Sequence, residues 1–265
     1  MPFHARSSCC LTGSATTRWG LTAAAASLVS ALCSSAALAQ QWYVAPAAVV
    51  PPTNWLVAID VSGTATSNHT DFLYGATTFA LGGTLQQSGL RLRLEGLGGT
   101  YGFEQAPTNV TTTGKQYEGG ALVGYQQIWN WGSLGTYIGA NVRENTVPST
   151  DGTGSSLGTR VGFKAAVDTY LLPTPAMMMS AYGSYSTAYD AYYARLRAGY
   201  SVFGVGYLGP EFAVLGDDYY NQTRVGAHLT GMQLGALQVG VSGGYVWDRA
   251  YKDGYYGTLE LRTGF

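Results

Sequence analysis

The stretch Leu90-Arg91-Leu92-Arg93-Leu94-Glu95 decides the fold class, because its residues alternate between apolar and charged. Successive side chains of a β-strand point to opposite faces, so the leucines share one face and the charges share the other. The same alternation recurs from Val161 to Asp168 and from Leu259 to Phe265. Alternation by itself is also compatible with a soluble β-sandwich, which would bury the apolar face in a core.

This alternating unit repeats along most of the chain. Between residues 54 and 265, segments of about ten residues are each followed by a break of Gly, Asn, Asp or Pro, as in transmembrane β-barrels. An even number of strands that close on one another leaves no unpaired edge in lipid. We therefore predict an all-β protein, a closed antiparallel transmembrane β-barrel of about 12 strands, at residues 54–66, 71–85, 89–104, 115–128, 133–146, 156–171, 176–188, 191–203, 205–216, 221–233, 236–249 and 255–265.

The composition agrees with a barrel better than with membrane helices. Only 11% of the 265 residues are charged, against roughly 25% in soluble domains. Two charge-free stretches, Gly119 to Val142 and Val225 to Trp247, exceed the roughly 20 residues of a membrane helix. Both are interrupted by turn residues and are rich in glycine, so we interpret each as a pair of strands.

The predicted register sorts the charges by face. Nearly every charged side chain of a strand falls on the inward face, where sparse charge and abundant glycine indicate a narrow lumen. The predicted lumen-lining residues are Arg91, Arg93, Glu95, Arg160, Lys164, Arg195, Arg197, Glu211, Arg224, His228, Glu260 and Arg262. The polar connections 105–114 and 147–155 both follow odd-numbered strands, so this end is predicted to be external and the termini periplasmic.

The N-terminus is predicted to be a targeting segment. Arg6 and Arg18 precede an apolar stretch from Leu21 to Leu38, and Ala37-Leu38-Ala39 has the small-x-small pattern of a signal-peptidase site. We predict a signal peptide at 1–39 cut after Ala39, a Pro-rich periplasmic lead-in at 40–53, and a barrel at 54–265 in the bacterial outer membrane. All three cysteines lie within 1–39, so the exported chain would contain no thiol.

The last third of the chain carries a family resemblance. Its segments are Ser184 to Tyr189, Tyr193 to Tyr200, Gly209-Pro210-Glu211, Leu215 to Tyr219, Arg224 to His228 and Tyr256 to Leu259; softer matches are Asp71 to Gly75, Leu90 to Gly96 and Leu122 to Gln126. They resemble the BcsS-type cellulose biosynthesis proteins of Gram-negative bacteria. The resemblance implies an outer-membrane protein linked to cellulose production and biofilm, without catalysis of its own, and it brings no catalytic residues.

Paired tyrosines next to acids mark three predicted outer hairpins. A girdle at the lipid boundary explains most of them. Aromatic faces beside carboxylates also bind glucan chains, which would suit a cellulose-linked protein. The candidate glucan-contacting rim residues are Tyr189, Tyr192, Tyr193, Tyr219, Tyr220, Tyr255 and Tyr256.

Catalytic and metal chemistry have little support. His228 lies two residues from Thr230, a pairing that lipid hydrolases use to activate a hydroxyl, but the predicted register turns it into the lumen. Asp217 and Asp218, with Asp248 and Asp253, offer oxygen ligands for Ca²⁺ at the rim, but a solvated acidic loop is the favoured interpretation. We expect no catalytic residue, metal or cofactor.

Three functions remain open. We favour a non-enzymatic accessory protein of cellulose biosynthesis or secretion, with outer-membrane lipid, cellulose and the secretion machinery as partners. The alternatives are a saccharide- or anion-selective channel and a lipid-modifying enzyme built on His228. A net charge of -1 without a basic block argues against a nucleic-acid partner.

Overall fold

The computed structural model describes residues 54–105, 110–147, 155–249 and 252–265. The predicted signal peptide, its cleavage site after Ala39 and the lead-in at 40–53 lie outside the described residues. Within the described part of the chain, no helix is long and apolar enough to cross a membrane.

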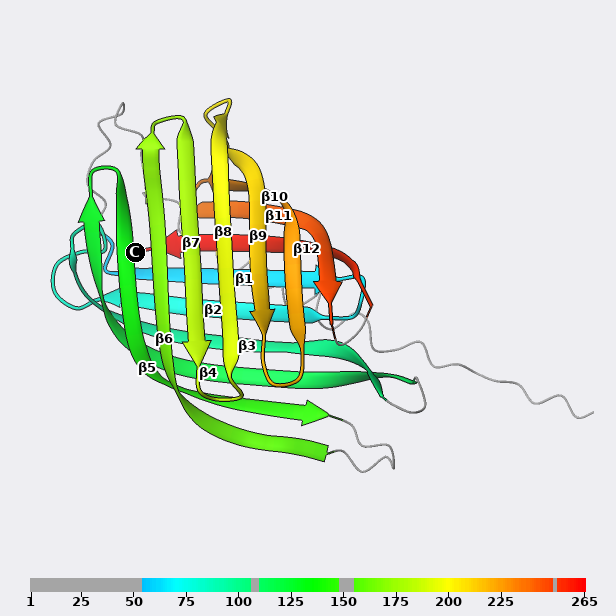
Figure 1. Cartoon of the computed structure of the whole chain (residues 1–265). Helices are drawn as coiled ribbons and strands as arrows, with labels where there is room; N and C mark the ends of the chain where they lie inside the picture. Colours follow the sequence, from blue (N-terminus) through cyan, green and yellow to red (C-terminus); the bar gives the residue numbers. More distant parts are fainter. Residues whose placement is uncertain (1–53, 106–109, 148–154, 250–251) are drawn as a thin grey trace, which may run out of the picture. The chain divides into compact units, whose positions relative to one another are not determined.

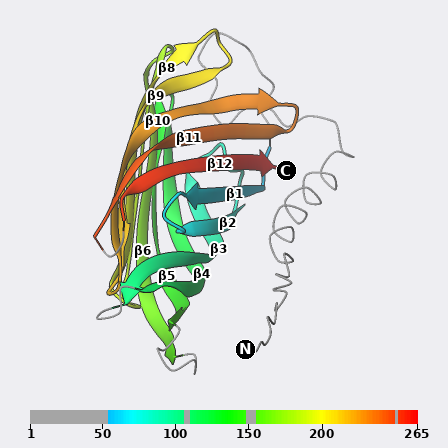
Figure 2. The same ribbon diagram turned by 90° about the vertical axis from the view of Figure 1, so that its right-hand side faces the viewer.

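Twelve antiparallel strands form one closed β-barrel (Figure 1). They are β1 (Val57–Thr66), β2 (Asp71–Ala80), β3 (Gly89–Gln105), β4 (Val110–Trp129), β5 (Gly132–Val147), β6 (Ser155–Thr174), β7 (Met177–Ser186), β8 (Ala191–Val202), β9 (Gly206–Gly216), β10 (Asn221–Leu234), β11 (Leu237–Asp248) and β12 (Gly254–Gly264). The predicted fold class and strand number are confirmed. Each strand pairs with its neighbours in sequence, and the pairing of β1 with β12 closes the sheet (Figure 2).

Closure depends on the pairing of the first strand with the last strand. Nine residue pairs join β1 to β12, from Ala58 opposite Gly264 to Thr66 opposite Tyr256. The ladder continues past the strand ends, because the Leu56 amide donates to the Phe265 carbonyl at 2.6 Å and the Phe265 amide donates to the Val57 carbonyl at 2.9 Å. Among the twelve described strands none is left as an edge, as the predicted barrel requires.

The strand ends differ most from the prediction in three places, and several others shift by one to three residues. The predicted loop 105–114 is mostly strand, because β3 and β4 stay paired as far as Gln105 and Val110. Thr111, Thr112 and Thr113 are β-branched, which favours this extension. β2 ends at Ala80, five residues early, and β6 runs on to Thr174 past an irregular register after Leu171.

The two faces of the barrel differ in polarity, as the alternation predicted. Outward positions carry exposed apolar side chains, among them Leu73, Val123, Val161, Phe163 and Leu196. Inward positions carry buried polar side chains. A barrel whose outer face is apolar and whose lumen is polar is of the membrane type, because lipid is then the solvent of the outer face.

In an up-and-down barrel, all connections that follow odd-numbered strands lie at one end, which we call the odd end; the others lie at the even end. In Figure 1 the strands of the near wall cross those of the far wall steeply. Strands must tilt in this way for a sheet to close into a barrel. The tilt brings side chains from non-adjacent strands together inside the lumen.

Candidate functional site: the polar lumen and the odd end

The predicted lumen residues lie on the inward face of the barrel. Eight of the twelve are buried: Arg91, Arg93, Glu95, Lys164, Arg197, Glu211, Arg224 and His228. The side chains of Arg195, Glu260 and Arg262 are partly exposed to a cavity of about 410 Å³ that they help to line. Arg160 differs, because its side chain is 52% exposed and contacts the turn at the odd end.

One group of ion pairs covers the wall formed by β3 to β6. The Lys164 ammonium contacts Glu95 and lies 2.7 Å from Glu118 Oε1. Arg93 Nη2 lies 2.6 Å from Asp168 Oδ2, and the Arg93 guanidinium stacks over the Tyr137 ring at 3.9 Å. These contacts join β3 to β6, three strands away around the barrel, so they bridge part of the lumen.

A second group connects β8, β9 and β12. Arg197 contacts Glu211 on β9 and Glu260 on β12, with 2.6 Å between Arg197 Nη1 and Glu260 Oε2. Arg195 also contacts Glu260, and the Tyr256 hydroxyl donates to Glu211 at 2.9 Å. β8 and β12 are four strands apart, so these pairs cross the barrel. Two carboxylates thus compensate two guanidinium groups where each charge alone would be costly to bury.

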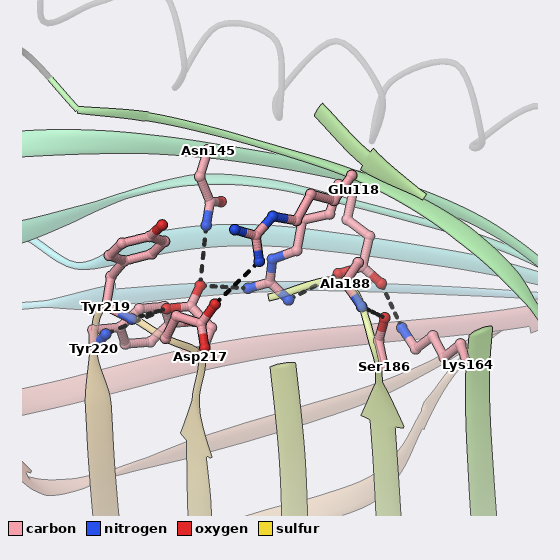
Figure 3. A network of polar contacts seen from close by, with 11 residues as sticks. Glu118, Asn145, Lys164, Ser186, Ala188, Asp217, Tyr219 and Tyr220 are labelled. Atoms are coloured by element: carbon pink, nitrogen blue, oxygen red, sulfur yellow. Dashed lines mark hydrogen bonds and ion pairs between the residues drawn. The ribbon is translucent and has the colours of Figure 1, made fainter. Parts of the chain in front are cut away.

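The β9–β10 turn, residues 217–220, folds into the odd end of the lumen (Figure 3). The Asp217 side chain has no exposed surface; its Oδ2 accepts from Arg143 Nη2 at 3.1 Å and from Asn145 Nδ2 at 3.3 Å. Its Oδ1 accepts from the Tyr219 amide at 2.8 Å and the Tyr220 amide at 3.3 Å. The predicted solvated acidic loop is therefore wrong for Asp217, because β5 supplies two donors that replace water.

Aromatic rings close the space beside this turn. Tyr220 stacks on Tyr101 of β3 with 5.3 Å between ring centroids, and Phe72 of β2 lies 6.2 Å from Tyr220. The three side chains pack with Leu215 and Tyr193 into one apolar cluster. Tyr101 and Phe72 were not among the predicted site residues. The alternation that places Arg91 and Arg93 inward also places Tyr101 inward, so the signal was present in the sequence.

The seven predicted rim tyrosines separate into two groups. Tyr189, Tyr220 and Tyr256 are buried, and Tyr192 and Tyr193 are partly buried, so they offer little ring surface to a polymer. This corrects the candidate glucan-contacting rim for the buried tyrosines: Tyr189 packs under Arg160 and against Tyr219, and the Tyr256 hydroxyl donates to Glu211 inside the lumen.

Tyr219 and Tyr255 do remain exposed. Tyr255, at 70% exposure, lies edge-on to Tyr245 with 5.5 Å between centroids, and Trp247 lies 5.0 Å from Tyr245. We call Tyr245, Trp247 and Tyr255 the aromatic cluster. Asp253 lies beside it and accepts from the Tyr245 hydroxyl at 3.4 Å. The sequence did not single out Tyr245 and Trp247, which fall on outward strand positions.

His228 is buried in the lumen wall with both ring nitrogens engaged. Nε2 lies 3.1 Å from the Ala198 carbonyl, and Nδ1 lies 3.1 Å from Thr230 Oγ1. A carbonyl only accepts, so Nε2 carries the proton and Nδ1 accepts from the Thr230 hydroxyl. In the described ranges, no group of three or more His, Cys, Asp or Glu residues is arranged to hold a metal ion.

Comparison of the sequence with models of protein families gives a match over most of the barrel. The model of the family "Cellulose biosynthesis protein BcsS" matches residues 61–265. The chain belongs to the BcsS family. This BcsS family member is therefore a cellulose biosynthesis-associated protein with the fold of an outer-membrane β-barrel, as the resemblance implied.

Several solved structures are similar to this BcsS family member at low identity. The KdgM porin is 7% identical, with 78% of this chain and 99% of that chain covered and a TM-score of 0.44. LpxR from Salmonella typhimurium is 13% identical over 78% and 100%, with a TM-score of 0.45. The transport unit of the autotransporter AIDA-I from Escherichia coli is 10% identical over 82% and 93%, with a TM-score of 0.47. No curated protein matches the chain.

Proposed function

We propose that the protein is a non-enzymatic outer-membrane accessory component of cellulose secretion that contacts the exported glucan at the odd end of its barrel. The observation that carries this proposal is the aromatic cluster of Tyr245, Trp247 and Tyr255 with Asp253 beside it. Sugar rings stack on aromatic faces and hydrogen-bond to neighbouring carboxylates. A rigid aromatic patch offers that contact area at little cost in side-chain entropy.

The ion-paired side chains inside the lumen favour glucan contact at the rim over passage of a glucan chain through the barrel. Arg195 and Glu260 join strands on different sides of the lumen, as do Arg143 and Asp217. The cavity of about 410 Å³ has the size of a small-molecule site. A glucan chain that threaded this lumen would have to break several ion pairs, and breaking a buried pair such as that of Arg143 with Asp217 is costly.

A role without catalysis is supported by the surroundings of His228. The side chain is buried, faces away from lipid and uses both ring nitrogens in hydrogen bonds. A lipid-modifying site needs its base to face the acyl chains or headgroups. An unchanged lipid profile of cells that carry His228→Ala is the expected result, and an altered profile would favour the enzyme.

Cellulose sedimentation of the purified protein tests glucan contact directly. We expect the wild-type barrel in detergent to co-sediment with cellulose, and Trp247→Ala/Tyr255→Ala to do so several-fold less. Tyr200→Ala is the matched control, because Tyr200 is an equally exposed aromatic on β8 toward the even end. Heat-modifiable migration on gels checks that each variant is folded. Absence of co-sedimentation by the wild type, or equal loss in the control, would contradict the proposal.

Deletion of the gene in a cellulose-producing strain tests the cellular role. We expect altered cellulose output or attachment, restored by the wild-type gene and less well by the Trp247→Ala/Tyr255→Ala variant. Unchanged dye binding and biofilm would count against an accessory role. A channel is the second candidate, favoured by the cavity; steady conductance in planar bilayers would support it, and silence would disfavour it.

A further inference from the structure

Arg224 is exceptional among the cations of the described lumen. Arg93, Arg143, Lys164, Arg195, Arg197 and Arg262 each lie against a carboxylate. Arg91 has no carboxylate partner, but it donates to three backbone carbonyls and to Gln126. Arg224 forms no ion pair with any carboxylate in the described ranges, although it is only 6% exposed.

The hydrogen bonds of Arg224 leave part of its donor capacity unused. Its Nη2 donates to Gln222 Oε1 at 2.7 Å, and Gln222 Nε2 donates in turn to Asp248 Oδ2 at 2.7 Å. The Arg224 Nε group is buried and has no partner within the described barrel. A guanidinium carries five N–H donors, and a buried donor without an acceptor is costly.

Glu211 does not provide the missing acceptor for the Arg224 Nε–H group. Glu211 is close enough to interact electrostatically with Arg224, but Arg197 and the Tyr256 hydroxyl engage its two oxygens. The other electrostatic neighbours of Arg224 are Tyr193, Tyr220 and Tyr256. A tyrosine hydroxyl can donate to an anion. Arg224 therefore lies among potential donors, with no carboxylate of its own.

We propose that Arg224, with Tyr193 and Tyr220, forms a binding site for an oxyanion, a carboxylate or phosphate group, inside the lumen. All three residues line the cavity of about 410 Å³, so the site has room for a small ligand that carries such a group. A guanidinium binds both groups through paired N–H donors. The bound oxyanion accepts from the Arg224 Nε–H and neutralises the uncompensated charge. This site is independent of the aromatic cluster.

The experiment titrates the purified barrel, in micelles of an uncharged polyoxyethylene detergent, with three probes. Inorganic phosphate and glucuronate test the two oxyanions, and glucose is the neutral control. We expect at least one oxyanion to give saturable calorimetric binding and to shift the Arg224 Nε–H cross-peak in NMR spectra, with no effect of glucose. Saturation by phosphate alone or by glucuronate alone identifies the preferred group.

Two variants localise the site. Arg224→Gln should weaken binding by about tenfold or more, because it removes a charge-assisted hydrogen bond. Arg262→Gln removes one positive charge from the same cavity at a residue paired with Asp60, and should bind nearly as the wild type does. No saturable binding, or equal losses in both variants, would overturn the proposal. If Arg224→Gln fails to fold, the Arg224 cross-peak of the wild type decides: a peak that does not move rejects the site.

Discussion

Arg143 of β5 and Asp217 of the β9–β10 turn form an ion pair, with 3.1 Å between Arg143 Nη2 and Asp217 Oδ2. β5 pairs with neither β9 nor β10, so the contact crosses the odd end of the lumen. Arg143 also lies 3.2 Å from Glu118, which in turn contacts Lys164. The turn is thereby connected to the ion pairs of the β3–β6 wall.

Asp217→Ala should release the β9–β10 turn. The substitution removes the pair with Arg143 and the acceptor of the Tyr219 and Tyr220 amides. Because a hydrogen bond to a charged group contributes about 1.5–3 kcal/mol, we expect these two amides to exchange with solvent about ten- to a hundredfold faster. Hydrogen exchange followed by NMR measures the effect. Asp253→Ala is the control, because it removes an exposed carboxylate that accepts from the Asp248 amide in the β11–β12 connection, and it should leave both rates unchanged.

The ionisation of Asp217 should make the free energy of unfolding depend on pH in the acidic range. Burial raises the pKa of Asp217 above the ordinary value of an aspartate, although Arg143 and the hydrogen bonds oppose the rise. Between the unfolded pKa and the raised folded pKa, the folded state binds more protons than the unfolded state. The contribution of Asp217 to stability therefore increases as the pH falls through this window.

Asp217→Asn mimics the protonated side chain and removes this titration. We expect the stability of the wild type relative to Asp217→Asn to rise when the pH falls from 7 to the usual carboxyl range. Unfolding midpoints of both proteins in detergent micelles at several pH values measure the difference. A difference that stays constant with pH, or that falls on acidification, would show that the pKa of Asp217 is not raised.

The cross-lumen ion pairs should dominate the electrostatic stability of the barrel. Arg197→Met leaves Glu211 buried without a guanidinium partner, and we expect a loss of about 3–5 kcal/mol in the free energy of unfolding. Arg160→Met removes a half-exposed pair with Asp218 and should cost only about 0–1 kcal/mol. Urea unfolding followed by tryptophan fluorescence compares the two. Similar losses in both variants would contradict the inside position of Arg197.

A charged substitution on the apolar outer face should destabilise the barrel more in the middle of a strand than at a turn. Val123 on β4 is exposed on the outward face, and Val123→Arg should cost about 2–4 kcal/mol if that face contacts the middle of a bilayer. Phe203→Arg lies in the β8–β9 turn, where the cost should fall to about 0–1 kcal/mol. Reversible unfolding from lipid vesicles measures both values. Equal costs would argue against lipid as the solvent of this face.

The sequence by itself determined the strands and their faces. Its period-2 alternation, read from Leu90 to Glu95 and repeated twelve times, is local information that each strand carries independently. It placed Arg93, Lys164 and Glu260 on the inward side without any knowledge of their partners. It did not determine the strand ends, because the pairing of β3 with β4 extends as far as the two strands form hydrogen bonds.

Only the tertiary structure decided which inward charges meet. Arg93 with Asp168 and Arg195 with Glu260 are pairs between non-adjacent strands, so they depend on the tilt and closure of the whole sheet. The same holds for Asp217 in the β9–β10 turn. The sequence predicted a solvated carboxylate, whereas in the folded barrel β5 supplies Arg143 and Asn145 as its donors. The lack of a carboxylate partner for Arg224 is likewise a property of the folded barrel, because it depends on how the other lumen cations and acids pair. Alternation fixes the face of a side chain, whereas its partner is set by closure of the barrel.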